Sequence, residues 1–202
     1  LYGRAYGIHK KVQPLLEKVG FKAPPETGGE EEGGYAVALL GFHRDASSLL
    51  YNLTESEPDL VKQTLVVDFN VALHGGIRET GATVKYGDLA NPETLHHLGL
   101  NECKVIVCTI PDDLLRGITN RQLVHVVREM APHAAIIANA IAIEEIPKVY
   151  AAGADYVYLN RFEAAWTLQR AVQAGIEEEI DLFRNKRQAR NHYKPDRKEI
   201  LS

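Results

Sequence analysis

The feature that most constrains this chain is a regular alternation, from Tyr35 onward, of short apolar runs with segments of helical apolar period. Such alternation is typical of a parallel sheet covered by helices on both faces. The fourth run, residues 104–109, is continuously apolar over residues 105–108, as expected of a central strand. The sequence therefore predicts an α/β fold, a Rossmann-like doubly wound parallel sheet of about six strands. The expected strands are residues 35–40, 65–69, 83–88, 104–109, 135–139 and 156–159.

Composition divides the chain into three parts. Residues 1–34 hold a short helical stretch and a linker rich in Pro, Gly and Glu, which cannot build a core. Residues 35–160 form the sheet domain, and residues 161–202 are predicted as one long helix, to about Arg190, with a basic tail. A helix of roughly 30 residues is about 45 Å long, so part of its apolar stripe is expected to find a partner beyond its own sheet.

Charge and composition exclude several classes of protein. Hydrophobic residues make up 45% of the chain, so it is not disordered as a whole. Lysine and arginine gather near both ends, at residues 1–22 and 184–202, while the body between them is acidic. An acidic body argues against nucleic acid as the main partner. The basic ends fit either an anionic membrane face or solvated helix ends. Since the chain begins at Leu1 and its one methionine is Met130, we expect it to be part of a longer protein.

The turn after the first strand, residues 41–46, has the spacing of a dinucleotide-binding loop. Gly41 is the first glycine and permits the tight turn, and Ala46 takes the third place, where close packing of helix on strand is needed. His43 stands where the second glycine belongs, so it either crowds a pyrophosphate or contacts a phosphate itself. The alternative is a plain turn that binds no ligand.

Acidic residues follow the next two strands. Asp68 is placed to accept hydrogen bonds from both ribose hydroxyls and would repel a 2′-phosphate, so the expected ligand is of the NAD or AMP type. The alternative role for Asp68 is to cap a helix without contacting a ligand. Asp88 either contacts an adenine amino group or caps its turn. Asp112 and Asp113 are expected to cap a long helix that starts after Pro111 and runs to about Met130.

Arrangements that support catalysis are missing from the sequence. No His and Cys spacing suits zinc, no Gly-Lys-Ser/Thr phosphate loop occurs, and no serine stands in a Gly-x-Ser-x-Gly turn. A nucleotide site without a chemical partner favours sensing over turnover.

In combination, the strand ends resemble the regulator-of-potassium-conductance family, also called potassium-transport, nucleotide-binding domains of the TrkA N-terminal type. The resemblance covers about residues 35–160. It rests on Val66-Val67-Asp68, Tyr86-Gly87-Asp88, the run from Val105 to Asp113, and the run from Ala151 to Val157.

The resemblance implies a cytosolic, non-enzymatic domain that binds NAD(H) or an AMP- or ATP-type adenosine nucleotide and regulates ion transport. It also implies a homodimer formed through the long C-terminal helix. The nucleotide contacts it implies are Gly41, His43, Arg44, Asp68, Phe69, Asp88 and Thr109.

Two departures from the family's pattern refine this expectation. His43 makes a smaller adenosine ligand more plausible than a full dinucleotide. The chain also has no room for a second ligand lobe, so it looks like the C-terminal domain of a Kef-type or sodium/proton antiporter. Residues 1–34 would then lead from a transmembrane antiporter domain of the same polypeptide, at the cytoplasmic face of the inner (plasma) membrane. The alternatives are an NAD-dependent oxidoreductase, or its cofactor-binding domain, and a structural dimerisation module.

Overall fold

The structure is a computed structural model that describes residues 34–115, 117–190 and 196–201. The helical stretch and linker predicted for the N-terminal part fall on residues 1–33 and lie outside the described residues. No helix in the described part of the chain is long and apolar enough to cross a membrane.

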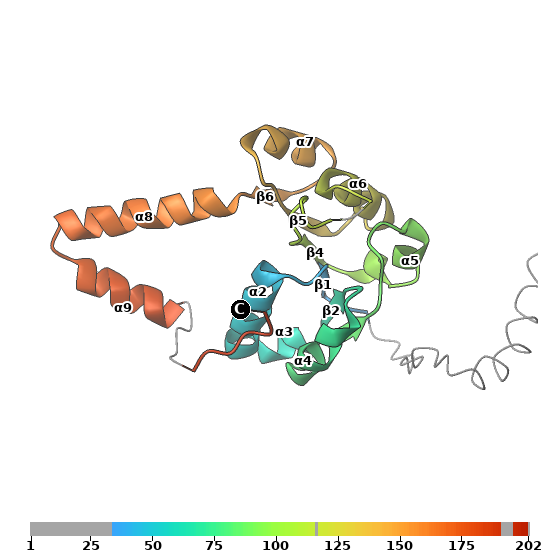
Figure 1. Cartoon of the computed structure of the whole chain (residues 1–202), viewed down its shortest axis with the longest axis horizontal. Coiled ribbons are helices and arrows are strands. Elements are labelled where there is room, and N and C mark those ends of the chain that lie inside the picture. The colour runs from blue at the N-terminus through green and yellow to red at the C-terminus, as the bar shows by residue number, and fades with distance from the viewer. Residues whose placement is uncertain (1–33, 116, 191–195, 202) are drawn as a thin grey trace, which may run out of the picture. The chain divides into compact units, whose positions relative to one another are not determined.

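Six parallel strands form one sheet in the order β3-β2-β1-β4-β5-β6 (Figure 1). Leu39 in β1 pairs with Val66 in β2 on one side and with Val107 in β4 on the other. The strand order reverses between β1 and β4, which is where open α/β sheets bind ligands. The predicted doubly wound α/β sheet is therefore confirmed. The strands are β1 (Val37–Leu40), β2 (Thr64–Val67), β3 (Thr83–Lys85), β4 (Val105–Cys108), β5 (Ala135–Asn139) and β6 (Tyr156–Tyr158).

Helices cover both faces of the sheet. On one face Leu50 and Ile77 are fully buried, and on the other Leu123 and Val127 are almost fully buried. Alternate residues of each strand point to opposite faces, so the strands are apolar on both. The helices are α2 (Arg44–Ser56), α3 (Pro58–Val61), α4 (His74–Glu79), α5 (Pro92–His96), α6 (Asn120–Met130), α7 (Ile146–Ala151), α8 (Asn160–Ile176) and α9 (Ile180–Arg190), with 3-10 turns at Val71–Leu73, Leu100–Glu102 and Ile143–Glu145.

Helix α6 starts later than predicted. The sequence prediction placed its start after Pro111, but the helix begins at Asn120, behind a capping box formed by Thr119 and Gln122. Gly117 has φ +77°, a conformation that interrupts a helix. Asp112 still serves the helix terminus, because its Oδ1 accepts a hydrogen bond from the amide of Asn120.

The long C-terminal helix predicted for residues 161–190 is two helices, so that prediction is wrong. The chain turns between α8 and α9, where Glu178 has φ +61° and the amide of Glu179 donates to the carbonyl of Ala174. A left-handed residue ends a helix because it turns the backbone away from the helical path. The two helices pack against each other and form a hairpin that extends from β6 (Figure 1). None of the residues in α8 is buried.

Residues 196–201 return to the body of the domain and end beside α2 (Figure 1). Ile200 and Leu201 pack against the apolar cluster under α2 and α4. The sequence suggested only a basic, solvated or membrane-facing tail here, so this docking is a finding of the structure.

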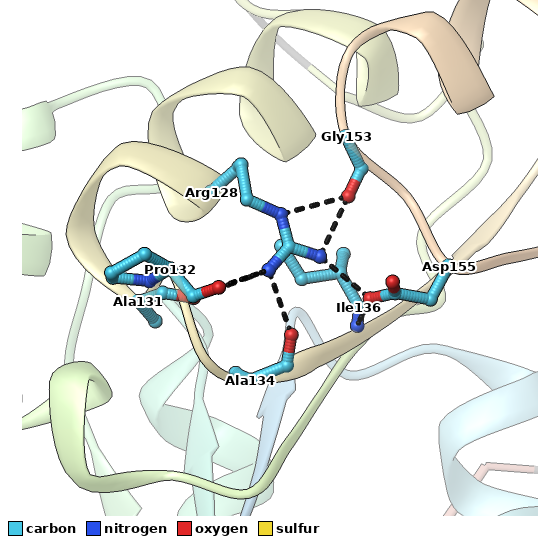
Figure 2. A network of polar contacts seen from close by, with 7 residues as sticks. All are labelled: Arg128, Ala131, Pro132, Ala134, Ile136, Gly153 and Asp155. Atoms are coloured by element: carbon cyan, nitrogen blue, oxygen red, sulfur yellow. Dashed lines mark hydrogen bonds and ion pairs between the residues drawn. The ribbon is translucent and has the colours of Figure 1, made fainter.

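Arg128 joins three segments on the opposite side of the sheet (Figure 2). Its guanidinium donates to the carbonyls of Ala134 and Gly153 and pairs with Asp155 at 2.6 Å. The same carboxylate oxygen of Asp155 accepts from the amide of Ile136 at 2.7 Å. One side chain of α6 thus holds the start of β5 and the turn before β6.

Candidate functional site

The turn between β1 and α2 requires glycine at position 41. Gly41 has φ +81°, and a Cβ on it would lie 2.0 Å from Cδ1 of Ile110. Its amide donates to the carbonyl of Val67 at 2.8 Å, and its carbonyl accepts from the Thr109 hydroxyl at 3.3 Å. The ends of β1, β2 and β4 are therefore tied together at this residue.

The first turn of α2 faces the same edge of the sheet without a side-chain cap. His43 is the N-cap residue, in extended conformation and half-buried, and its ring makes no capping hydrogen bond. Arg44 follows and is exposed. Uncapped amides at a helix N-terminus can bind an anion, because they are free donors at the positive end of the helix dipole.

Asp68 is buried at the end of β2 and holds two loops with its carboxylate. Oδ2 accepts from the amide of Phe42 at 2.7 Å, and Oδ1 accepts from the amide of Asn70 at 2.7 Å. Its carbonyl accepts from Nε2 of His74 at 3.1 Å, which requires the proton on Nε2. Since a carboxylate oxygen accepts two hydrogen bonds, each oxygen retains one acceptor position.

A cavity of about 300 Å³ opens beside these loops, beyond the carboxyl ends of β2, β3 and β4. Its walls are mainly apolar and include two aromatic side chains, Phe69 and Tyr86, that are 62% and 61% exposed. Aromatic faces with few polar groups suit the base of a nucleotide. The lining residues are Phe69, Tyr86, Asp88, Leu89, Ala90, Ile110, Leu114, Leu115 and Ile118.

Asp88 brings a carboxylate to this cavity. Its Oδ1 accepts from the amide of Ala90 at 2.9 Å, so the residue caps its own turn. Asp88 is exposed, and Oδ2 has no described hydrogen bond. The turn cap and a contact to a ligand, which stood as alternatives in the sequence analysis, are therefore compatible.

A third carboxylate, that of Asp45, lies at the first turn of α2 and was not among the predicted site residues. Oδ2 of Asp45 accepts from the Tyr158 hydroxyl at 3.2 Å and from Nδ2 of Asn160 at 3.0 Å. Burial, together with the nearby Asp45 carboxylate, raises the pKa of Tyr158. Asp45 places negative charge near the uncapped amides and connects the predicted nucleotide loop to the start of α8.

Sequence comparison identifies the family. Residues 37–160, more than half of the chain, match the TrkA-N domain. The chain belongs to the TrkA-N domain family. This agrees with the family that the ordered strand ends resemble.

Solved structures resemble this TrkA-N domain in fold. The TrkA-N domain of the inner membrane protein ybaL from Escherichia coli is 25% identical with a TM-score of 0.59, and the match covers 69% of this chain and 97% of that one. The NAD(P)-binding domain of an exopolyphosphatase-related protein from Archaeoglobus fulgidus is 19% identical, with a TM-score of 0.55 and coverage of 71% and 98%. The GsuK channel bound to NAD is 20% identical, with a TM-score of 0.53 and coverage of 72% and 25%. This TrkA-N domain thus spans a quarter of the GsuK chain. Comparison with curated protein sequences gave no match.

The seven predicted site residues fall into three groups in the TrkA-N domain. Gly41, Asp68 and Thr109 form the hydrogen-bonded corner, and Phe69 and Asp88 line the cavity. The remaining two, His43 and Arg44, stand at the start of α2. All seven lie at the carboxyl edge of the sheet, and no described hydrogen bond involves the side chain of either of the last two.

The sequence analysis missed two features of this edge. Asp45 sits inside the six-residue loop, and a carboxylate in the first turn of a helix is a visible signal in the sequence. The contact of Ile110 with Gly41 has no such signal, because it depends on how the strand β4 ends. Across residues 34–115, 117–190 and 196–201 no group of three His, Cys, Asp or Glu side chains is arranged to hold a metal ion.

Proposed function

We propose that this TrkA-N domain binds an adenosine nucleotide at the carboxyl edge of its sheet and regulates transport of a monovalent cation. The observation that carries the proposal is the position of Asp68. Its buried carboxylate, with one acceptor position left on each oxygen, holds the loop after the glycine turn, and Phe69, the next residue, lines the cavity with aromatic walls. Family membership supports the same role.

The ligand we propose is NAD(H) or an AMP- or ATP-type nucleotide, with its base in the 300 Å³ cavity and its ribose against Asp68. The solved GsuK structures that share the fold include forms bound to NAD and to ADP, which supports this class of ligand. The Asp45 carboxylate lies near the phosphate position and opposes additional negative charge there. Among these ligands we therefore favour those with few phosphates.

The proposed partners are a cation/proton antiporter domain of the same polypeptide, at the cytoplasmic face of the membrane, and a second copy of this chain. The second copy would pack on α8, because no residue of this helix is buried and several of its large apolar side chains are exposed. Exposed apolar surface of this extent on one helix is typical of an interaction site. A bound nucleotide would favour one arrangement of the dimer and thereby one state of the transporter.

A ligand screen with matched variants tests the nucleotide site. Asp68→Ala alone would confuse binding with folding, because Asp68 also holds two loops. Phe69→Ala and Asp88→Asn change the cavity wall without breaking that corner, and Glu144→Gln removes an exposed carboxylate elsewhere. A ligand at 100 times its dissociation constant stabilises by about 2.7 kcal/mol, which corresponds to a rise in Tm of roughly 5–10 °C.

We expect at least one of AMP, ADP, ATP, NAD and NADH to raise the Tm of the wild type and of Glu144→Gln. The rise should be smaller in Phe69→Ala and Asp88→Asn. If no nucleotide shifts the Tm, or if all variants respond alike, the site is wrong. Chromatography of the ligand after incubation separates a sensor from an NAD-dependent oxidoreductase, because only the oxidoreductase would alter its cofactor when offered reducible substrates.

A further inference from the structure

A second cavity, of about 540 Å³, lies away from the strand ends, between α2, α4 and the C-terminal residues 196–201. Helices α2 and α4 supply two sides of it, with Tyr51 and Thr54 from the first and Gly76 from the second. The C-terminal segment supplies the third side through Lys198 and Glu199. The segment therefore lies in a groove between two helices that cover the same face of the sheet.

Polar contacts join this segment to α2. The Ser48 hydroxyl donates to Oε2 of Glu199 at 2.7 Å, and the amide of Leu201 donates to the Ser47 hydroxyl at 2.9 Å. Ser47 is 1% exposed, so the segment provides a partner for a buried hydroxyl. Leaving such a group unpaired would be unfavourable, which makes the contact specific to this arrangement.

Arg197 and Glu199 form an ion pair that is largely withdrawn from water. Their side chains are 18% and 16% exposed, and Nε of Arg197 lies 2.6 Å from Oε1 of Glu199. Such a pair is tolerated only where further contacts offset the loss of hydration. Here Nη1 of Arg197 also donates to Oδ1 of Asn52 at 3.0 Å, and the guanidinium lies 4.2 Å from the centre of the Tyr51 ring.

The apolar part of the segment fits a space left by glycine. A Cβ on Gly76 would lie 3.5 Å from side-chain carbons of Ile200, so the isoleucine lies directly over the α4 backbone. Ile200 and Leu201 pack with Leu49, Leu53 and other members of the cluster beneath. The polar contacts of Arg197 and Glu199 with α2, the hydrogen bond to the buried Ser47 hydroxyl and the apolar contacts together hold this segment in the groove.

The other end of the hairpin is also held by α2. Tyr158 at the end of β6 and Asn160 at the start of α8 both donate to Asp45 in the first turn of α2. The hairpin of α8 and α9 thus leaves the domain at one end of α2, and residues 196–201 bind along the same helix.

We propose that residues 196–201 are a latch: they dock in the groove of their own chain between α2 and α4, and together with Asp45 they fix the orientation of the α8–α9 hairpin. The latch does not depend on a bound nucleotide. The groove between α2 and α4 is thus a binding site for a peptide of the pattern Arg-x-Glu-Ile-Leu, which residues 197–201 of the same chain provide.

The test compares the whole chain with a variant that carries Arg197→Ala and Ile200→Asp together. The matched control is Asp196→Asn, which removes an exposed charge from the same segment at a residue that does not line the cavity. Amide exchange measured by NMR reports docking through the Leu201 amide. Spin labels at Glu93→Cys in α5 and Glu177→Cys at the hairpin turn report orientation, and the native cysteines are buried.

In the wild type and in Asp196→Asn we expect the Leu201 amide to exchange at least about 10-fold more slowly than an unprotected amide. We also expect one narrow distance distribution between the labels. The latch variant should lose the protection and broaden the distribution, while the amides of the strands stay protected. Ser48→Ala, a milder change on α2, should reduce the protection of Leu201 by a few-fold.

Three results would overturn the proposal. The first is an unprotected Leu201 amide in the wild type. The second is a distance distribution that is equally narrow in the latch variant. The third is a paramagnetic effect on Leu201 from a label carried by a different copy of the chain, because this would place the segment on a neighbour.

Discussion

The guanidinium of Arg128 and the backbone of Gly153 fit each other at contact distance. Nε and Nη2 of Arg128 donate to the Gly153 carbonyl at 3.0 and 2.8 Å (Figure 2). Gly153 has φ +114°, and a Cβ on it would lie 2.8 Å from Cγ of Arg128. Two independent features therefore require glycine at position 153: its backbone conformation and the closeness of the Arg128 side chain.

Gly153→Ala should lower the free energy of unfolding by about 2–3 kcal/mol, since the strained backbone and the contact with Arg128 act together. Gly175→Ala is the matched control, because Gly175 lies in α8 with no heavy atom within 4 Å of an added Cβ. That variant should be neutral or stabilised by up to about 1 kcal/mol. Urea denaturation measures both, and equal stability of the two variants would contradict the prediction.

Asp155 should make stability depend on pH. The hydrogen bond from the Ile136 amide, followed by the contact with Arg128, lowers the pKa of Asp155 below its usual 3.8. A carboxyl whose pKa is lower in the folded state stabilises above its unfolded pKa, and this contribution is lost as pH falls through the folded pKa. Asp155→Asn should therefore be less stable than the wild type at pH 6, by less than about 1 kcal/mol because the pair is half exposed. The difference in stability between Asp155→Asn and the wild type should disappear below pH 3.8. A difference that stays constant across pH would contradict the lowered pKa of Asp155.

Gly41→Ala should destabilise the domain by about 2 kcal/mol or more, through its positive φ and the contact with Ile110. Ile110→Ala in the same chain removes the contact but leaves the φ unfavourable. We expect the double variant to be less destabilised than the sum of the single variants, with a coupling of about 1 kcal/mol. Strict additivity in thermal unfolding would show that the two residues do not meet.

If the proposed dimer packs on α8, Trp166→Glu should weaken self-association at least about 10-fold, because it would place a charge in that proposed interface. Trp166 is 53% exposed and stacks with Arg170, whose guanidinium lies 4.9 Å from the ring centre. Ala164→Glu adds the same charge at an exposed position on the opposite side of α8 and should leave association unchanged. Analytical ultracentrifugation distinguishes the cases, and a wild type that stays monomeric at high micromolar concentration would end the dimer proposal.

The sheet could be predicted from the sequence because its strands are buried on both faces. Continuous apolar runs such as residues 105–108, separated by helical patterns, leave few other arrangements. The turn at Gly41 and the acidic end of β2 were also predictable, since their chemistry is local. The cap of α5 rests on the same kind of local chemistry, because the Asn91 side chain accepts from the Glu93 amide two residues on.

Features that depend on distant residues were not predictable. The late start of α6 depends on the turn around Gly117, and the division of the long helix depends on a left-handed Glu178, a conformation that glutamate rarely adopts. The groove for Ile200 exists because α2 and α4, which are separate in the sequence, come to line the same cavity. Apolar periodicity cannot indicate such a meeting, because it identifies one face of each element but not its neighbour.

Helix α2 has 13 residues; its first turn contacts the start of α8, and its third turn contacts Arg197 in the C-terminal segment. A tilt of α2 would therefore move the hairpin formed by α8 and α9 with it, because both the start of α8 and residues 196–201 are attached to α2. Small displacements at the sheet edge would then become larger movements at the far tip of the hairpin. The size of that movement depends on the length of the α8–α9 hairpin, and the sheet itself does not have to rearrange.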